Sequence, residues 1–437
     1  MPQIRRIHLG VDFGTSNSKI VFRDYGAPGG ERTVLVEKGA SFLIPSRVCA
    51  GPMEFSFGNK TSTADMCDIY ESVKIQAAAE VTGDSSYYFG PLKSLPAGFS
   101  FADLAVLVVW YLISEGQRAI STYFADNMEG VRIGMSMGVP MAFYRHKALR
   151  PFFLLMARRA WLIYRAEGLL GPVLLFDKAK KILASHPVSA VPETPDYDVR
   201  TWIRSEAEAA MCWPFQSPAV AAGPYVKMDI GAGTSHASLY RIYGDSQTPK
   251  RGIAFFGATS VTVGMDAVDR AIAESDGREG DCLEIRGTEQ AVLQSKPKAL
   301  AAIKPVQEAI YVSYRRAWIE TYRKLQEYPS ELEAWRGHRM FSIGGGSLVP
   351  LVIDSLRVHP AGGNIAIAPT ALEPPPDLFR ADGSSVTPGD LPFLAVAYGL
   401  SNIDFSVPEA FTPDEVPPMP ERNERRERLD RDDLYAR

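Results

Sequence analysis

Two aspartates, at corresponding places in two copies of one short pattern, are the residues of this chain best suited to chemistry. In each copy an apolar run leads into Asp12 or Asp229, and a turn of glycine and hydroxyl residues follows; the copies span residues 7–16 and 226–235. A second strand-like run follows each turn, which predicts two β-hairpins whose tips use glycine for close backbone approach. Tip amides and hydroxyls can hold phosphate oxygens, and the carboxylate can hold a hydrated Mg²⁺ that bridges to them. Two such tips predict two lobes that close on one nucleotide.

A third glycine-rich turn lies further along the chain. Residues 340–350 are patterned as a short strand, a glycine turn at residues 344–346 and a helix start, where Pro350 is tolerated in the first turn. The glycines allow the backbone to lie flat against a nucleoside, and the N-terminus of the following helix favours nearby negative charge. This turn is expected to complete a nucleotide site together with the two hairpins.

The order of these three elements resembles that of the actin-like ATPase superfamily, which includes the seventy-kilodalton heat-shock chaperones, actins and carbohydrate kinases. The chain is most similar to the ATPase domain of the chaperones. Further segments resemble that domain in the same order: residues 44–48, 57–60, 72–75, 137–143, 205–210, 264–269 and 394–400. The likeness extends over roughly residues 7–401, nearly the whole chain.

The resemblance implies an α/β fold of two lobes, built from duplicated ribonuclease-H-like domains with a cleft between them. Lobe I is expected over residues 1–222 with a returning helix at 391–405, and lobe II over residues 223–390 with a helical subdomain at about 280–338. Residue patterning predicts a helix at 101–120 and a strand at 131–139 in lobe I, and a helix at 303–325 and a surface loop at 372–391 in lobe II. Residues 406–437 are rich in proline and then in charge, so a flexible tail is expected there. In the chaperones a linker and a substrate-binding domain would begin at this point, and residues 406–437 are not expected to form either.

The resemblance also implies ATP or ADP with Mg²⁺ as cofactors. Asp12 and Asp229 are expected to serve catalysis by holding Mg²⁺ through bound water. The nucleotide is expected to contact the glycine-rich and hydroxyl residues of the three turns, which are Gly14, Thr15, Ser16, Asn17, Gly231, Ala232, Gly233, Thr234, Gly344, Gly345, Gly346 and Ser347.

Two further residues are expected to take part in catalysis. Lys74 matches the segment that carries the catalytic lysine of the chaperones, and Glu206 matches the helix start that supplies their water-positioning glutamate. A lysine facing the γ-phosphate neutralises charge, and a glutamate can orient the attacking water. Either residue could instead be a solvated helix residue, and Glu208 is the alternative to Glu206.

Three residues near the turns have less direct interpretations. Lys19 is expected to be a strand-edge charge, and strand alternation is expected to point His236 away from the ligand. Leu348 stands where the chaperones use an arginine that stacks on adenine. Loss of that planar cation weakens the preference for adenine over guanine.

Composition limits the remaining function classes. The chain has 437 residues, 46% of them hydrophobic, which is enough for at least two domain cores. The net charge of −4 argues against a general nucleic-acid-binding surface. The four cysteines include no C-x-x-C pair, and the longest apolar run, residues 104–113, is about half of what a membrane-spanning helix needs. With its first strand starting almost at once, the chain is expected to be soluble and cytoplasmic, without nucleic-acid or membrane partners.

Four functions remain open for such a chain. The first is a chaperone-like switch, a slow Mg-dependent ATPase that signals its nucleotide state to a partner protein. The others are an actin-like filament former, a carbohydrate kinase, for which no sugar signature is present, and a nucleotide-binding scaffold with little hydrolysis. The partner is expected to dock on the tail, residues 406–437, although a solubilising end is the alternative, and residues 303–325 are the second candidate surface.

Overall fold

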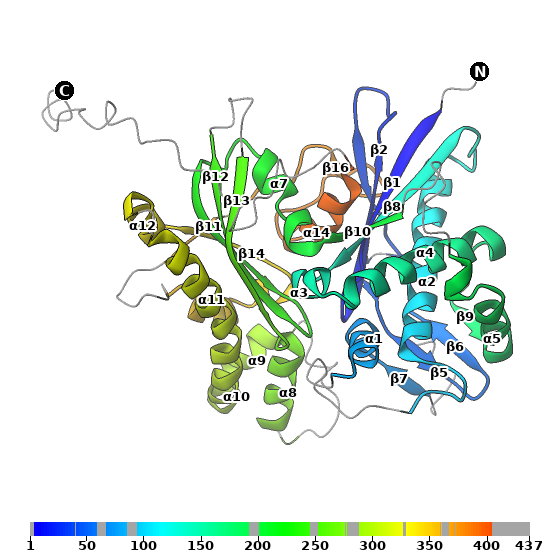
Figure 1. The fold of residues 1–437 in the computed structure, drawn as a ribbon, viewed down its shortest axis with the longest axis horizontal. Helices are drawn as coiled ribbons and strands as arrows, with labels where there is room; N and C mark the ends of the chain where they lie inside the picture. The colour runs from blue at the N-terminus through cyan, green and yellow to red at the C-terminus, as the bar shows by residue number, and fades with distance from the viewer. Residues whose placement is uncertain are drawn as a thin grey trace, which may run out of the picture.

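The computed structural model of this chain is a mixed α/β structure with three β-sheets. It describes residues 4–39, 41–58, 67–84, 94–191, 201–244, 252–275, 277, 288–326, 329–358, 360, 367–370 and 372–403. Figure 1 shows the two larger sheets side by side, with the blue and cyan N-terminal part of the chain around one and the green and yellow part around the other. The α/β class expected from the sequence is confirmed.

The first half of the chain builds a seven-stranded sheet together with one short strand from the second half, β16. Along its main path the strands follow the order β10-β8-β1-β2-β3-β16, and β4 pairs with β2. β1 and β2 are antiparallel, and β1 and β8 are parallel. The strands are β1 (Arg5–Asp12), β2 (Asn17–Asp24), β3 (Arg32–Leu35), β4 (Ile44–Pro45), β8 (Val131–Val139), β10 (Thr201–Ser205) and β16 (Leu378–Phe379).

The second half of the chain builds a five-stranded sheet that repeats this topology. Its order is β13-β12-β11-β14-β15, with β11 antiparallel to β12 and parallel to β14. The strands are β11 (Gly223–Ile230), β12 (Ser235–Tyr243), β13 (Gly252–Val261), β14 (Arg339–Ile343) and β15 (Ala368–Pro369). In both sheets a hairpin is followed by a third antiparallel strand on one side and by parallel strands on the other.

Strand alternation divides the residues of β11 between two environments. Val226, Met228 and Ile230 belong to the apolar core of the second sheet, which the helices of this half cover. Lys227 and Asp229 therefore face the other way, toward the first half of the chain. The helices of the second half are α8 (Met265–Ser275), α9 (Glu289–Ser295), α10 (Pro297–Ala302), α11 (Lys304–Leu325), α12 (Pro329–Arg336), η4 (Gly345–Leu348), α13 (Pro350–Ile353) and η5 (Asp354–Leu356).

The largest core lies in the first half, where the apolar helix α2 packs among the strands. Ser100 caps α2, because its hydroxyl accepts from the Asp103 amide while the Asp103 carboxylate accepts from the Ser100 amide. A four-stranded sheet of order β7-β5-β6-β9 flanks this core. Its strands are β5 (Val48–Ala50), β6 (Glu54–Phe57), β7 (Asp68–Tyr70) and β9 (Val173–Leu175). The helices of this half are α1 (Val73–Thr82), α2 (Phe101–Tyr123), α3 (Met141–Arg145), α4 (Leu149–Glu167), α5 (Phe176–Ser185), η2 (Val188–Ala190), α6 (Glu206–Ala209) and α7 (Cys212–Gln216).

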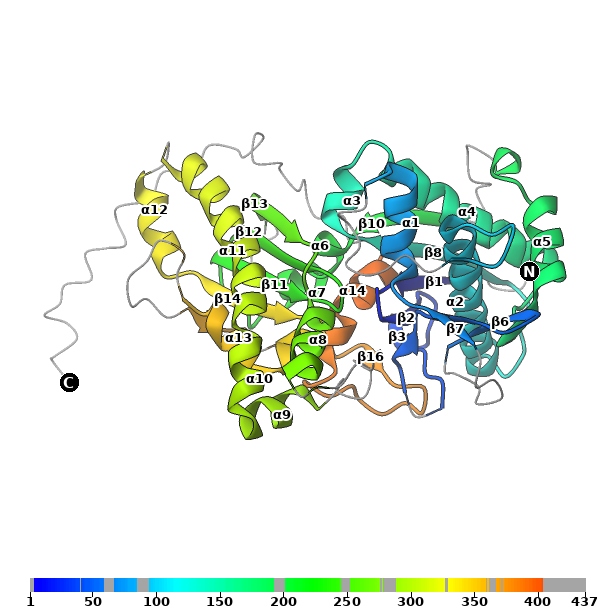
Figure 2. The same cartoon turned by 90° about the horizontal axis from the view of Figure 1, so that it is seen from below.

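One helix from the end of the described chain lies between the two larger sheets. Figures 1 and 2 show α14 (Leu391–Ser401), in orange, in the middle of the molecule. Glycines permit its close packing: a side chain on Gly399 would overlap the backbone of Ala209 in α6, and one on Gly10 of β1 would overlap the backbone of α14. The helix α14 thus packs between the two halves, next to the site described below.

The structure departs from the sequence expectation at residues 372–391, which were expected to form a surface loop within lobe II. Strand β16 lies in this stretch and pairs in parallel with β3 of the first sheet. Leu378 is buried, and the carboxylate of Asp377 accepts hydrogen bonds from Arg23 and Thr33. Burial and these side-chain bonds therefore override the turn-forming composition.

Several expectations concern residues outside the described ranges. The tail at 406–437 lies wholly outside them, and the expected helical subdomain at about 280–338 lies partly outside. The returning helix, expected over 391–405, ends at Ser401. Within the described residues, no helix combines the length and the apolarity that crossing a bilayer requires.

Candidate functional site

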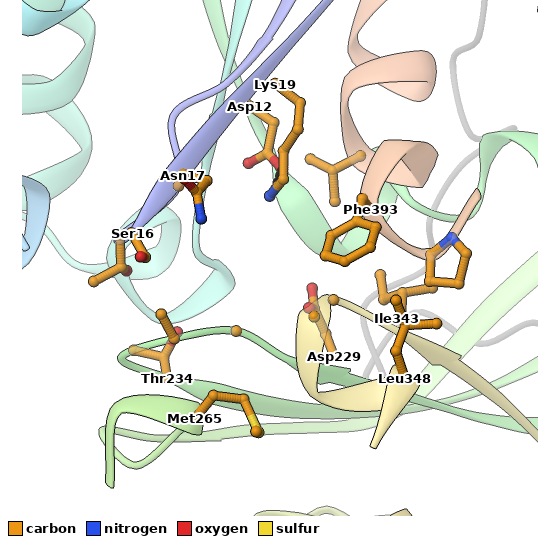
Figure 3. Close-up of a pocket in the computed structure, with 18 of the residues that line it drawn as sticks. Asp12, Ser16, Asn17, Lys19, Asp229, Thr234, Met265, Ile343, Leu348 and Phe393 are labelled. Atoms are coloured by element: carbon orange, nitrogen blue, oxygen red, sulfur yellow. Dashed lines mark hydrogen bonds and ion pairs between the residues drawn. The ribbon is translucent and has the colours of Figure 1, made fainter. Parts of the chain in front are cut away.

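A cavity of about 350 Å³ lies where the tips of the two hairpins meet. Its walls come from both halves of the chain, and Figure 3 shows Asp12, Ser16, Asn17 and Lys19 on one side of it and Asp229 and Thr234 on another. The tips touch, since a side-chain carbon on Gly233 would lie 2.9 Å from Cγ2 of Thr15. Segments more than 200 residues apart thus enclose one space.

Most residues that the sequence predicted for the site line this cavity. They are Asp12, Gly14, Thr15, Ser16, Asn17, Lys74, Glu206, Asp229, Gly231, Ala232, Thr234, Gly344 and Gly345. Three predicted residues support the walls instead. Gly233 packs on Thr15, Gly346 is buried against Ile230, and the Ser347 hydroxyl donates to the carbonyl of Gly344 at 2.8 Å.

The tip between β1 and β2 is fixed by backbone bonds. The Gly14 amide donates to the Asp12 carbonyl at 3.0 Å, and the Ser46 amide donates to the Ser16 carbonyl at 2.8 Å. Below the tip, the buried hydroxyls of Ser18 and Ser46 lie 2.6 Å apart. A side chain on Gly14 would overlap the carbonyl oxygen of Asn17, so this position requires glycine for space.

The tip between β11 and β12 is fixed against a helix. The Gly231 amide donates to the Thr234 carbonyl at 2.9 Å. The carbonyls of Gly231 and Ala232 accept from the amides of Met265 and Asp266 in the first turn of α8. These bonds satisfy two helix-terminal amides that have no partner within the helix, and they tie the tip to the helical layer.

The charges on the first-half side of the cavity are paired. Lys19 Nζ lies 3.0 Å from Asp12 Oδ2. Lys74 is almost fully buried, and its Nζ donates to Glu206 Oε1 at 2.5 Å and to the carbonyl of Phe13 at 2.6 Å. Lys74 is the second residue of α1. The helix is preceded by Ser72, a non-glycine residue with φ 53°, which is a conformation that L-residues disfavour. Burial raises the pKa of the Glu206 carboxyl, and the Lys74 ammonium opposes that shift.

The charges on the second-half side are not paired in this way. Among the residues that the structure describes, none forms a hydrogen bond with Lys227 Nζ, although this side chain is 1% exposed. Burial lowers the pKa of the Lys227 ammonium, and attraction to Asp229 and Glu206 opposes the shift. Burial raises the pKa of the Asp229 carboxyl, with Lys227 opposing and Asp12 reinforcing the shift.

Lys19 and His236 differ from the sequence expectation, because both line the cavity. The hairpin register explains their position: Lys19 pairs with Asp12 and His236 pairs with Asp229, and directly paired residues share one face of a sheet. His236 Nε2 lies 3.2 Å from Thr234 Oγ1, and burial lowers the pKa of its imidazole to about 4. Lys19 and His236 each stand seven positions after the aspartate of their hairpin. This shared spacing could have identified both as site residues.

The opposite end of the cavity is mostly apolar. Figure 3 shows Phe393, Ile343 and Leu348 there. Phe393 comes from the first turn of α14, and Leu348 is 43% exposed. The cavity is also lined by Leu43, Pro140, Val349, Pro392, Val396, Met265, Glu289 and Gln290. Ile343, Leu348, Val349, Met265 and Val396 lie in segments that the sequence motifs identified. The sequence offered no motif for Phe393, Leu43, Glu289 and Gln290, since separate segments contribute them.

The carboxylates suit a hydrated cation. Within the described ranges, no group of three or more His, Cys, Asp or Glu side chains could hold a metal ion directly. Mg²⁺ keeps several bound waters and is often held by only one or two carboxylates together with substrate phosphates. Asp12 and Asp229 line the same cavity, and a cation bound there would relieve the repulsion that adds to burial in raising the pKa of Asp229.

No protein-family model matches the chain, and no curated protein matches its sequence. The chemistry of the site therefore has to be inferred from the geometry of its own residues.

Proposed function

We propose that the cavity binds a magnesium–nucleoside triphosphate and that the chain is a chaperone-like molecular switch, which hydrolyses ATP slowly and signals its nucleotide state to a partner protein. One observation carries the proposal. Two hairpins of the same register bring glycine-rich, hydroxyl-bearing tips and one aspartate each to a single cavity. Backbone amides and hydroxyls at such tips are suited to phosphate oxygens.

The repeated topology supports a two-lobed fold like that of actin-like ATPases. The two larger sheets share one strand order and one set of strand directions, and a hairpin tip of each lies at the same cavity. Each half would form a lobe, with α14 between them. Movement of one lobe relative to the other would then depend on what the tips hold, which is the property a nucleotide switch needs.

The phosphate end of the cavity would hold the charged part of the ligand. Asp12 and Asp229 would bind Mg²⁺ through its water ligands, and the metal would supply positive charge that neutralises the phosphates. The hydroxyls of Thr15 and Thr234 would donate to phosphate oxygens. Lys19 lies beside Asp12 and would add a second positive charge at this end.

Hydrolysis would use Lys74 and Glu206. The carboxylate of Glu206 would orient a water molecule and accept its proton, and the Lys74 ammonium would stabilise charge on the transferring group. The two side chains already bind each other, so a phosphate must compete with Glu206 for the ammonium. That competition favours slow turnover. It also supports the second candidate function, a nucleotide-binding scaffold with little hydrolysis.

The test is titration calorimetry with Mg-ATP, with ATP in a metal chelator, and with two matched variants. We expect Asp229→Asn to weaken Mg-ATP binding by about 10- to 100-fold, the range seen when groups that support a metal are lost. Asp12→Asn is expected to weaken it less, because the same change frees the Lys19 ammonium for the phosphates. Absence of any binding heat or thermal shift with Mg-ATP would refute the proposed function.

Phosphate release distinguishes the switch from the scaffold. Glu206→Gln keeps the size of the side chain and can still accept from Lys74, but it cannot accept a proton from water. If the wild-type protein releases phosphate and Glu206→Gln does not, at unchanged ATP affinity, the switch is supported. Binding without release in the wild-type protein would favour the scaffold. The partner-docking role of residues 406–437 stays a prediction from the sequence.

A further inference from the structure

The apolar end of the cavity contains one aromatic side chain whose position is fixed from two sides. Phe393 lies in the first turn of α14, where Pro392 at the helix start restricts the backbone. A side-chain carbon on Gly345 would lie 3.3 Å from Cε1 of Phe393, so the ring edge borders the glycine turn. Behind it, the ring of Phe42 packs edge-on with 6.0 Å between the centroids. The ring is therefore held in place before any ligand enters.

The chemistry of this end differs from that of the hairpin tips. The lysines that line the cavity, Lys19 and Lys74, both bind carboxylates at the tip end. Near Phe393 the walls are the aliphatic side chains of Ile343 and Leu348, and Figure 3 shows the ring on the same side of the cavity as these two. Leu348 lines the cavity and is 43% exposed, so it offers apolar surface to a ligand. A flat ring system would cover it.

We propose that Phe393 is the platform on which the base of the bound nucleotide stacks, and that it makes the site selective for nucleotides with a purine base. This inference rests on the proposed function. Stacking on an aromatic ring accepts any base, because every base has a π-face. A purine offers a larger face than a pyrimidine, whereas adenine and guanine offer similar ones. The site should therefore prefer purines and discriminate little between ATP and GTP.

Two polar side chains from one helix of the second half allow limited further recognition. Glu289 and Gln290 come from α9 and line the cavity. The amide oxygen of Gln290 already accepts from the Leu351 amide at 3.2 Å, which holds this side chain against the start of α13. Their contribution to base choice would therefore be smaller than that of Phe393.

The experiment compares ligands with and without a base on variants of Phe393. Calorimetry would measure Mg-ATP, Mg-GTP, Mg-CTP and Mg-tripolyphosphate, the last of which has neither base nor ribose. We expect Phe393→Ala to weaken Mg-ATP and Mg-GTP by about 10- to 100-fold, as alanine substitution of a stacking residue does. Tripolyphosphate affinity should change less than about twofold, because that ligand reaches only the tips. Mg-CTP should bind more weakly than Mg-ATP to the wild-type protein and lose less in the variant.

Two further variants separate stacking from packing. Phe393→Trp retains an aromatic face and should keep most of the ATP affinity, whereas Phe393→Leu retains apolar bulk without that face and should lose at least about tenfold. Tyr322→Ala removes a partly exposed aromatic ring from α11, away from the cavity, and serves as the matched control with unchanged binding. The thermal midpoint of each unliganded variant shows whether it folds.

The outcomes distinguish the two proposals. If the wild-type protein binds neither Mg-ATP nor Mg-tripolyphosphate, the proposed function fails. If it binds both, and Phe393→Ala weakens them equally or Phe393→Leu binds ATP like the wild type, the stacking role is wrong while the nucleotide site stands. Equal affinity of the wild type for Mg-CTP and Mg-ATP would overturn the purine preference.

Discussion

The hairpins β1–β2 and β11–β12 place the residue seven positions after their aspartate directly across from it, but that residue is Lys19 in the first and His236 in the second. Lys19 forms an ion pair with Asp12. Burial lowers the pKa of His236 to about 4, so its imidazole is neutral at pH 7 and forms no ion pair with Asp229. Two copies of one pattern therefore present different electrostatics, and the cross-strand neighbour makes the difference.

The buried lysines of the two halves differ in the same way. Lys74 is bound to Glu206 and to the carbonyl of Phe13. Lys227 is equally buried, yet no described residue hydrogen-bonds its ammonium. The first half thus brings a charge network that is already satisfied. The second half brings Lys227, which no described residue hydrogen-bonds, and Asp229, whose charge the proposed cation would compensate. We infer that the second hairpin responds most strongly to binding.

The largest expected effect separates the two lysines. Lys74→Met should lower the free energy of unfolding by about 3–5 kcal/mol, because it leaves the Glu206 carboxylate buried without its partner. Lys227→Met should leave that free energy unchanged or raise it by about 1–3 kcal/mol, because an apolar side chain of similar volume replaces an unpaired buried charge. Urea unfolding at pH 7 without ligand measures both.

The opposite ranking would break the contrast between the halves. If Lys227→Met destabilises the protein as much as Lys74→Met does, the ammonium of Lys227 is stabilised by Asp229 and Glu206 as firmly as Lys74 is. Lys298→Met, an exposed change on α10, controls for the loss of a positive charge at the surface.

An intermediate effect is expected from the glycines of the two tips. Gly14→Ala should cost about 2–3 kcal/mol of stability, because the added methyl group overlaps the Asn17 carbonyl and forces a backbone shift. At Gly231 the same methyl group would lie 3.2 Å from the Thr234 carbonyl, so Gly231→Ala should cost less than about 1 kcal/mol. Thermal unfolding compares the two variants, and equal losses would show that both tips are equally tight.

The smallest expected effect concerns pH and the buried histidine of the first half. His8 lies on β1 next to Ser136, and burial lowers the pKa of its imidazole to about 3. Between pH 6.5 and 3 the unfolded chain binds a proton at this residue that the folded protein does not bind. Stability should therefore fall as the pH drops below 6.5, by up to about 1.4 kcal/mol per pH unit.

His8→Gln removes this contribution and should flatten the loss of stability between pH 6 and 5. Urea midpoints at the two pH values give the measurement. His236 has a similarly lowered pKa and contributes in the same direction, so the slope should decrease without vanishing. An unchanged slope in His8→Gln would mean that His8 titrates alike in the folded and unfolded states.

Local patterns predicted many elements well. The strand expected at 131–139 is confirmed as β8, and the helices expected at 101–120 and 303–325 are confirmed as α2 and α11 within a few residues. Apolar periodicity and glycine turns act over a few residues, so they can be seen without tertiary information. For the same reason the hairpins and the glycine turn at 344–346 could be found in advance.

The remaining features depend on which segments meet. Lys74 and Glu206 are 132 positions apart, and only packing shows that they bind each other. Buried Lys227 is attracted by Glu206 of the other half of the chain, and the pairing of β16 with β3 brings a proline-rich stretch into the first sheet. Phe393 belongs to an apolar helix whose sequence gives no sign of a cavity.

Residue type and spacing alone predict the turn chemistry, which consists of two aspartates ahead of glycine tips and a third glycine turn that can approach a ligand closely. Backbone sterics make this possible, because glycine alone tolerates such close contacts. Tertiary packing places these turns and Phe393 at one cavity, and it pairs Asp12 with Lys19 while no described residue forms an ion pair with Asp229. Charge compensation and burial depend on distances through space, and these are settled only when distant segments pack together.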